Sequence, residues 1–373
     1  MSKVKLKTLI KIFLIIPGIY IWFFSITFGS NCNESINVCG WLENVFIVKT
    51  NNTTASAVKL SEDFFVTNKH VVEDNLNVNL YNSEGVRFNA KVLHNDHPAD
   101  IVILSKNHEK EFKVNPIKIS KNYNGLRSVA FGIGRDKIRI FPPGDLISVP
   151  LERFKQARIH STVRNLPGIS GGALINEKGN LVGILTSGSG NYNEAIPINI
   201  LNEVIKSTSM NFNGNISRYT SIKKCAQLIE MMNINPKILS KNELSNAEIE
   251  CKSANLKSFF DMLGQIYGNL GNIQKSLLFL EISSDLDPNS PTSLISLAIA
   301  YQFNRDFKNQ VKVLKKLIKL IPNDVLVLRM AIQSAAFSND INFARQSLNL
   351  INKNNKRSFK QAYEFLKQTF PRI

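Results

Sequence analysis

The sequence predicts two folded parts of different class, an all-β part from about residue 44 to 186 and an all-α part from about residue 254 onward. In the first part, short apolar runs such as VFIVKT, LNVNLY, SVAFGIG and LVGILT are separated by turn residues at close intervals. This spacing favours a β-barrel or β-sandwich over alternating strands and helices. In the second part, apolar residues recur three and four positions apart, which is typical of amphipathic helices. A chain of 373 residues is long enough for two or three such domains.

The charge pattern indicates a solvated surface rather than a nucleic-acid site. The formal net charge is +17, but the lysines are spread along the whole chain. No basic stripe is interleaved with aromatic residues that would stack on bases. A nucleic-acid partner is therefore not expected.

Residues 1–33 form a targeting segment rather than part of a fold. Four lysines between Lys3 and Lys11 are followed by a run without charge up to Glu34, which includes IFLIIPGIYIWFFSITF. A cleaved signal peptide is one interpretation. The run is also long enough to span a bilayer and has bulky aromatic residues near its end, which favours an uncleaved anchor. In both cases the lysines stay in the cytoplasm and the chain after residue 30 is exported.

Export permits disulfides, and the chain has four cysteines. The shortest loops result from pairing Cys32 with Cys39 and Cys225 with Cys251, although the sequence leaves the connectivity open. The cysteine spacing is not that of a metal site. We expect neither a metal nor another cofactor.

The α-helical part contains an internal repeat. A set of large, small and aromatic positions recurs in register, namely Leu263-Gly264, Tyr267, Leu280 and Pro288, then Leu297-Ala298, Tyr301, Leu314 and Pro322. A third, weaker copy lacks the final proline. The pattern resembles the tetratricopeptide repeat (TPR), a pair of antiparallel helices with the same spacing, over about residues 257–356. An unrelated helical bundle is the alternative. Residues 357–373 would form the capping helix that covers the last apolar face.

A possible nucleophile lies in the glycine-rich stretch LPGISGGAL. A serine hydroxyl is a poor nucleophile at neutral pH, so Ser170 would need a histidine to accept its proton and a carboxylate to orient that histidine. His70 follows an apolar strand in FFVTNKHVVED, and Asp100 stands directly before the apolar run IVIL. Each of the three also fits a structural role when taken alone. Their order along the chain is that of chymotrypsin. The other four histidines lie in polar loops or a mixed strand-like run: His94, His97, His108 and His160.

These segments resemble trypsin-like peptidases of the HtrA (Deg) group over about residues 40–205. TNKHVV, ADIVIL, SVAFGIG, LPGISGGAL and EAIPI look like that group's signatures, in the same order and with compatible spacing. The resemblance implies a double β-barrel with the active site between the barrels. It also implies His70 as general base, Asp100 as the residue that orients it, and Ser170 as nucleophile. The backbone N–H groups of Gly168 and Ser170 would form the oxyanion hole.

The chain departs from this group in three respects, and the first is Ile169 before the serine, where trypsin-type zymogens have an aspartate that pairs with a new N-terminus after cleavage. No PDZ-like region follows the protease domain, since the helical repeats occupy that place. Arg164, six residues before the serine, would lie near the base of the primary specificity pocket and would favour acidic side chains before the scissile bond. The long side chain can also turn out to solvent. Thr186, Ser187 and Gly188 would form the pocket wall.

Together these features predict a multi-domain chain. The expected parts are a signal peptide or anchor (1–33), a trypsin-like protease domain (36–207), a linker with a helical segment (208–253), TPR-like repeats (254–356) and a capping helix (357–373).

The predicted function is that of an exported serine endopeptidase that acts on protein or peptide substrates. We expect it to be held in a bacterial cytoplasmic membrane by a single pass, with the protease and repeats on the periplasmic or extracellular side, or to be periplasmic or secreted if the segment is cleaved. The repeats would recruit protein partners or substrates in their groove, so that a chain ending near Ser207 would still cleave unstructured proteins. The alternative is a non-catalytic binding scaffold built on a degenerate protease domain and the repeats.

Overall fold

The computed structural model describes residues 32–373, apart from 107–118, 133–136, 165, 210–215, 236–239 and 355. Residues 1–31, which make up nearly all of the predicted signal or anchor segment, lie outside the described residues. Within the described part of the chain, no helix is long and apolar enough to cross a membrane. Residues 35–373 form one compact unit that begins with two short helices, α1 (Ile36–Cys39) and α2 (Trp41–Asn44).

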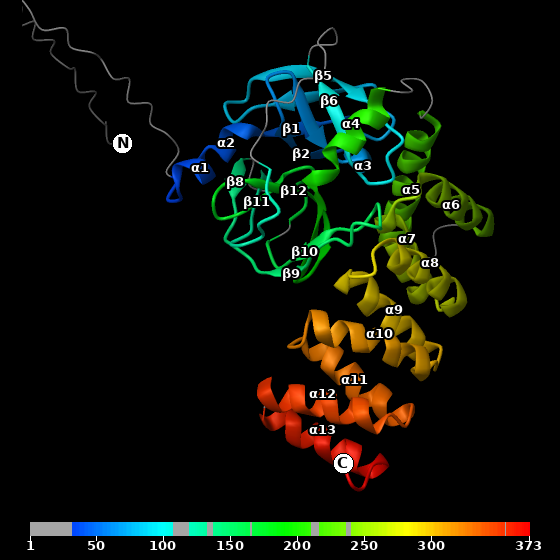
Figure 1. The fold of residues 1–373 in the computed structure, drawn as a ribbon. Coiled ribbons are helices and arrows are strands. Elements are labelled where there is room, and N and C mark those ends of the chain that lie inside the picture. Colours follow the sequence, from blue (N-terminus) through cyan, green and yellow to red (C-terminus); the bar gives the residue numbers. More distant parts are fainter. Residues whose placement is uncertain are drawn as a thin grey trace, which may run out of the picture. The chain divides into compact units, whose positions relative to one another are not determined.

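Six antiparallel strands form a closed barrel in the order β1-β2-β3-β6-β5-β4 (Figure 1). Buried and more exposed residues alternate along β4 and along much of β5, whereas every residue of the paired strands β3 and β6 is buried. The segment that follows β3 and the segment that precedes β6 are therefore attached to fully buried strands. The strands are β1 (Val45–Lys49), β2 (Thr54–Lys59), β3 (Phe64–Thr67), β4 (Asn77–Tyr81), β5 (Arg87–Leu93) and β6 (Val102–Ser105).

Seven further strands form a second antiparallel sheet in the order β8-β7-β11-β12-β13-β10-β9. The sequence resemblance predicts a second closed barrel, but the outer strands β8 and β9 do not pair with each other in the described residues. Both strands are short and partly exposed, so the pairing ends there. The strands are β7 (Arg127–Phe131), β8 (Ile138–Ile140), β9 (Leu146–Ser148), β10 (Ile159–Ser161), β11 (Ala173–Ile175), β12 (Leu181–Ser189) and β13 (Tyr192–Pro197).

An apolar cluster joins the barrel to the second sheet. Val66 and Ile103 of the barrel belong to the same buried cluster as Ala173 and Ile184 of the second sheet. Each sheet also has a cluster of its own. Burial of aliphatic side chains on both sides of this junction fixes the two sheets against each other.

Two long helices lie where the sequence predicts a linker with a helical segment. After the short helices η1 (Ile198–Ile200) and α4 (Leu201–Ser209), α5 (Ile216–Ile234) and α6 (Lys241–Ala254) form a pair within the predicted linker. A disulfide between Cys225 and Cys251 joins them, and their apolar residues share one core with α7 and α8. Cys32 and Cys39, the other two cysteines of the chain, are also disulfide-bonded.

Three helix pairs then follow at equal spacing along the chain. Their first helices begin at Lys257, Pro291 and Val325, and their second helices at Ile273, Phe307 and Ile341. At Gly264, an added Cβ would lie 2.4 Å from Leu280 Cγ, which explains the small residue at this repeat position. The helices are α7 (Lys257–Asn269), α8 (Ile273–Leu286), α9 (Pro291–Phe303), α10 (Phe307–Leu320), α11 (Val325–Phe337), α12 (Ile341–Asn354) and α13 (Lys356–Thr369).

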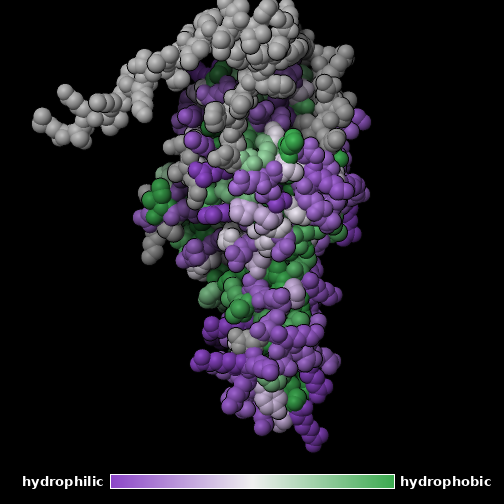
Figure 2. Space-filling model, turned by 90° about the vertical axis from the view of Figure 1, so that its left-hand side faces the viewer, coloured by the Kyte–Doolittle hydropathy of each residue, from purple (hydrophilic) through white to green (hydrophobic). Residues whose placement is uncertain are grey.

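The last helix, α13, covers the end of the repeats. Leu366 and Phe370 are buried in the same apolar cluster as residues of α11 and α12. On the face shown in Figure 2, hydrophilic residues predominate and hydrophobic residues occur in small groups. Lys312, Lys316 and Lys319 of α10 are exposed, as expected for a solvated lysine surface.

Candidate active site

His70 lies in a one-turn helix, α3 (Lys69–Val72), which directly follows β3 rather than ending the strand itself. The start of this helix is fixed by a hydrogen bond, because Asn68 Nδ2 donates to the carbonyl oxygen of Asp100 at 2.9 Å. The backbone N–H of His70 donates to Asp100 Oδ1 at 3.1 Å. The ring Nδ1 lies 2.5 Å from Asp100 Oδ2. The structure thus brings together two predicted residues that are well separated along the chain.

The Asp100 carboxylate determines the tautomer of the imidazole. Asp100 is 2% exposed, and burial alone would raise its pKa. The charge of His70, its hydrogen bonds and the nearby Arg158 outweigh burial and lower the pKa of Asp100 below its usual value. An ionised carboxylate only accepts hydrogen bonds, so Nδ1 of His70 is the donor. The neutral ring then presents Nε2 as an acceptor.

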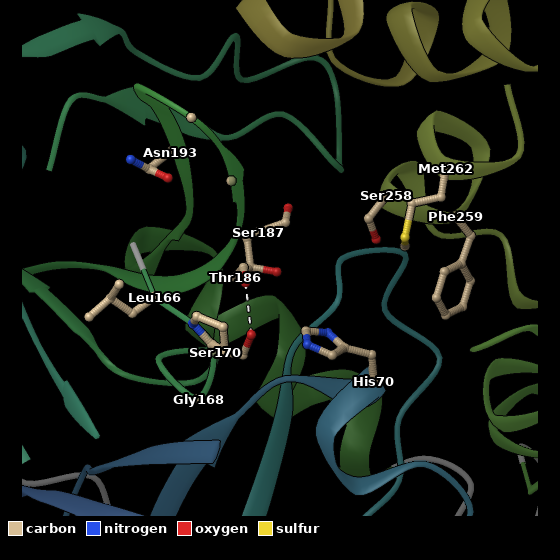
Figure 3. Close-up of a pocket in the computed structure, with 13 residues that line it drawn as sticks. His70, Leu166, Gly168, Ser170, Thr186, Ser187, Asn193, Ser258, Phe259 and Met262 are labelled. Carbon is tan, nitrogen blue, oxygen red and sulfur yellow. Dashed lines mark hydrogen bonds between the residues drawn. The ribbon is translucent and has the colours of Figure 1, made fainter. Parts of the chain in front are cut away.

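Thr186 contacts both Asp100 and Ser170. Its hydroxyl donates to Asp100 Oδ2 at 3.3 Å, and its carbonyl oxygen accepts a hydrogen bond from Ser170 Oγ at 2.8 Å (Figure 3). The sequence resemblance assigns Thr186 to the pocket wall alone, and these two bonds were missed. Among the described residues, Ser170 Oγ makes no hydrogen bond with His70.

The loop before Ser170 presents two backbone N–H groups without an acceptor in the described residues, those of Gly168 and Ser170. The loop is held from the barrel, because Ser56 Oγ donates to the carbonyl oxygen of Gly168 at 3.0 Å and Ser56 N–H donates to that of Ser170 at 2.8 Å. Gly168 has φ +93° and Gly171 has φ +83°, conformations that favour glycine. A Cβ at Gly171 would lie 2.0 Å from the carbonyl oxygen of Ser56. Two donors are therefore free to bind an oxyanion.

A cleft of about 380 Å³ opens beside His70 and Ser170 (Figure 3). It is lined by the three predicted wall residues, Thr186, Ser187 and Gly188, together with Leu166, Pro167, Gly168, Gly190, Asn193, Ser258, Phe259 and Met262. Ser258, Phe259 and Met262 belong to α7 of the helical part.

The prediction that Arg164 lies near the base of this cleft is wrong. Arg164 is exposed and does not line the cleft, and its carbonyl oxygen accepts a hydrogen bond from Ser128 Oγ at 3.0 Å. Asn193 lines the cleft instead, because the β12–β13 pairing sets it opposite Gly188. Its Nδ2 donates to the carbonyl oxygen of Val163 at 2.6 Å, and its buried Oδ1 has no partner in the described residues. No sequence signal marked Asn193, since the strand register brings it there.

Buried charges connect the second sheet to the helical part. Arg158 Nη1 lies 2.5 Å from Glu194 Oε2 and donates to Ser187 Oγ, and Lys257 Nζ lies 2.5 Å from Glu194 Oε1. Burial would raise the pKa of Glu194, but Lys257, Arg158 and His160 lower it well below its usual value. We call this the α7 contact, formed by Lys257, Asp287 and Ser290 of the helical part against Arg158, His160 and Glu194.

A second contact, the α5 contact, supports the loop that leads to Asp100. Arg218 donates to the carbonyl oxygens of His97 at 3.1 Å and Pro98 at 3.2 Å. The hydroxyl oxygen of Tyr219 accepts from the backbone N–H of Asn95 at 3.2 Å. The α5 contact thus consists of Arg218 and Tyr219 against residues 94–98.

The other described histidines lie outside the cleft. His94 packs edge-on against Tyr219 with ring centroids 4.3 Å apart, and burial lowers its pKa to about 4. His97 is buried in the same loop, and His160 Nε2 lies 2.8 Å from Asp287 Oδ2. His108 falls outside the described residues. His70 is therefore the only described histidine that lines the cleft.

Comparison with known proteins finds similarity in the β part. Residues 55–184 match the family model of the trypsin-like peptidase domain, and this range contains His70, Asp100 and Ser170. Serine endoprotease DegS of Haemophilus influenzae is 27% identical over 183 residues, which are 43% of this chain and 51% of the relative. The chain thus spans about half the length of this curated relative.

Solved structures with similarity to this chain include two peptidases. The inactive form of the Rv3671c protease of M. tuberculosis H37Rv is 18% identical, with a TM-score of 0.38, over 47% of this chain and 93% of that chain. The HtrA-type protease AlgW with a tripeptide is 22% identical, with a TM-score of 0.39, over 47% of this chain and 63% of that chain. The family match and the DegS relative support the predicted serine endopeptidase. Residues 55–184 therefore resemble a trypsin-like peptidase domain, and a helical region follows the β part.

Proposed function

We propose that this chain is a serine endopeptidase that works through an acyl-enzyme. Ser170 Oγ attacks the scissile carbonyl carbon while His70 Nε2 accepts the hydroxyl proton. Asp100 holds the ring in the required tautomer and stabilises the imidazolium. His70 then returns the proton to the departing amine, and a water activated by the same ring releases the acyl group. The observation that carries this proposal is the His70–Asp100 pair beside Ser170 at the mouth of the cleft.

The N–H groups of Gly168 and Ser170 would bind the negative oxygen of the tetrahedral intermediate. They have no acceptor in the described residues, and the donors are fixed before the substrate arrives. Removal of one such donor costs roughly 100-fold to 1,000-fold in rate.

The hydroxyl of Ser170 must leave the Thr186 carbonyl oxygen before it transfers its proton to His70. This bond is also the observation that favours the second candidate function, a non-catalytic binding scaffold, because it withholds the hydroxyl from the imidazole. Catalysis would require a rotation about χ1 of Ser170 from the Thr186 carbonyl oxygen toward His70 Nε2, and side-chain rotations of this kind are fast on the scale of catalysis. We therefore interpret this arrangement as a resting state of an enzyme.

Labelling with a fluorophosphonate probe tests this proposal. The probe forms a covalent bond only with an activated serine, so we expect the purified chain to be labelled and the Ser170→Ala variant to stay unlabelled. Ser187→Ala, which changes another serine of the cleft, serves as the matched control and keeps the label. An unlabelled wild-type chain that is folded by circular dichroism would favour the scaffold function.

We propose further that the three helix pairs are tetratricopeptide-type repeats that recruit protein partners or substrates. Their equal spacing along the chain and the small residue packed at Gly264 support this assignment. Loss of binding to a partner on deletion of α9–α12, with the active site intact, would test it.

Export across a bacterial cytoplasmic membrane, with the N-terminal segment as anchor, also remains a proposal. The disulfide between Cys225 and Cys251 fits an oxidising compartment outside the cytoplasm. In spheroplasts, which keep the cytoplasmic membrane intact, an added protease should degrade the C-terminal part of this protein while a cytoplasmic marker protein stays intact. Protection of both proteins would contradict export.

A further inference from the structure

The substrate cleft has walls from two different regions of the chain. On one side lie Ser170, the loop of residues 166–168 and strand β12; on the other lie Ser258, Phe259 and Met262 of α7. In Figure 3, Phe259 and Met262 lie on the side of His70 that faces away from Ser170. The family match assigns no role to this helix, since the family model covers only residues 55–184.

We propose that Phe259 and Met262 form a substrate subsite that accepts an apolar side chain. This subsite would receive the residue directly before the one that enters the primary pocket. The proposal rests on the endopeptidase function proposed above and specifies part of its substrate class.

The path of the substrate follows from the open edge of β12. Strand β13 pairs with one edge at Gly188 and Ser189, whereas on the other edge the strand pairing found among the described residues, with β11, ends at Ile184. An extended peptide can therefore add as a strand beside residues 187–189. Successive side chains of a strand point to opposite faces. When one side chain enters the pocket beside Ser187 and Asn193, the preceding side chain points toward His70 and α7.

The chemistry of the α7 wall selects an apolar group. Phe259 is buried, and Met262 is partly exposed with a flexible, polarisable thioether that adapts to different shapes. None of the described residues that line the cleft is Asp, Glu, Lys or Arg. A charged substrate side chain at this position would lose hydration without gaining a partner, whereas an apolar one would gain from burial.

The α7 contact holds this wall in place relative to the pocket. Lys257 directly precedes Ser258, is fully buried, and pairs with Glu194, the neighbour of Asn193. Its backbone N–H donates to Gln156 Oε1 at 2.9 Å. The bonds of Lys257 thus connect the start of α7 to the strand that carries Asn193, close to the cleft on both sides. A defined subsite requires such fixed walls.

The test compares internally quenched peptides that differ only in the residue before the one in the primary pocket. For the full chain in detergent, we expect kcat/KM to be at least about 10-fold higher with leucine than with aspartate at this position. Met262→Lys should reduce this ratio about 10-fold or more by favouring aspartate. Met262→Ala keeps an uncharged wall as a conservative variant and should retain most of the preference for leucine.

Met231→Lys provides the matched control, because Met231 lies exposed on α5 and away from the cleft. It should leave the ratio unchanged. The labelling rate with a small fluorophosphonate should be equal in Met231→Lys and the unsubstituted chain, because Met231 lies away from the cleft. An unchanged ratio in Met262→Lys, or no preference for leucine in a labelled wild-type chain, would overturn the subsite. Absence of labelling in the wild-type chain would instead indicate failure of the proposed enzymatic function.

Discussion

Two of the contacts between the helical region and the β part, the α5 contact and the α7 contact, differ in chemistry. At the α5 contact, Arg218 and Tyr219 bind backbone groups of residues 94–98, so most of the bonds there connect a side chain with a peptide group. At the α7 contact, ionised side chains from both regions pair with each other and are almost fully buried, as for Lys257 and Glu194. The first contact supports the loop that carries Asp100, and the second supports the cleft wall.

This difference determines what happens when one partner is lost. A peptide carbonyl that loses Arg218 can turn to water at the edge of the contact. A buried carboxylate that loses Lys257 stays in a poorly solvated site with its charge uncompensated. The α7 contact is therefore the more sensitive to single substitutions, although its net contribution as an intact network is smaller than the cost of breaking it.

The largest effect is expected when both contacts are removed together. The sequence alone predicts that a chain ending near Ser207 still cleaves unstructured proteins. The structure leads to the opposite prediction, because such a chain exposes the Asp100 loop and leaves Arg158 and Glu194 without Lys257. We expect no fluorophosphonate labelling of a chain ending at Ser209. A chain ending at Asn354, which lacks only α13, keeps both contacts and should be labelled; equal labelling of the two would contradict this coupling.

Substitution of Lys257 by methionine breaks the α7 contact alone. It should lower the free energy of unfolding by about 3–5 kcal/mol, since Glu194 loses one of its two cationic partners at 2.5 Å in a buried site. Urea denaturation followed by circular dichroism measures this change. Lys224→Met removes an exposed ion pair with Glu250 and should cost about 0–1 kcal/mol. Similar losses in the two variants would argue against the role assigned to Lys257.

The two contacts should lose their contributions to the free energy of unfolding in different pH ranges. Burial lowers the pKa of His94 from 6.5 to about 4, so the unfolded chain binds its proton first as the pH falls. Stability from the α5 contact is complete above pH 6.5 and is lost between pH 6.5 and 4, by about 3 kcal/mol. Glu194 has a lowered pKa, so its stabilising effect is complete above pH 4.5 and is lost only below that value.

The measurement is the free energy of unfolding between pH 7 and 4.5. His94→Phe should make the decline in this range shallower, and burial of His97, whose pKa is also lowered, accounts for part of the slope that is left. Glu194→Gln should lower stability at all of these pH values without reducing the slope. A decline as steep in His94→Phe as in the unsubstituted chain would contradict the role of His94.

The smallest effect is expected for Tyr219→Phe. The ring and its packing against His94 remain, but the buried N–H of Asn95 loses its acceptor, which costs about 1–3 kcal/mol. Because Asn95 precedes Asp100 in the same loop, we also expect slower labelling of Ser170. Tyr301→Phe, which removes a more exposed hydroxyl bonded to Glu281, should leave both stability and labelling nearly unchanged.

The features of this protein that were predicted from the sequence all depend on short local patterns. The strand-and-turn spacing predicted the β domain, and the repeat predicted paired helices over about residues 257–356, where α7 to α12 lie. The predicted trio of His70, Asp100 and Ser170 converges in the structure because each stands at the end of a buried strand or in a glycine-rich turn. Arg164 was misplaced since proximity to Ser170 along the chain does not decide where a long, flexible side chain points.

By itself, the sequence determined local matters: which segments form strands or helices, where glycine permits a turn, and which residue types suit acyl transfer. Only the tertiary structure decided that α7 lines the cleft, that Asn193 faces the pocket, and that Lys257 meets Glu194 across 63 positions. The physical reason is that burial and strand register bring together residues that are far apart in the sequence, and no periodic pattern marks such pairs. A buried lysine cannot be told from a surface lysine in the sequence until the partner that compensates its charge is known.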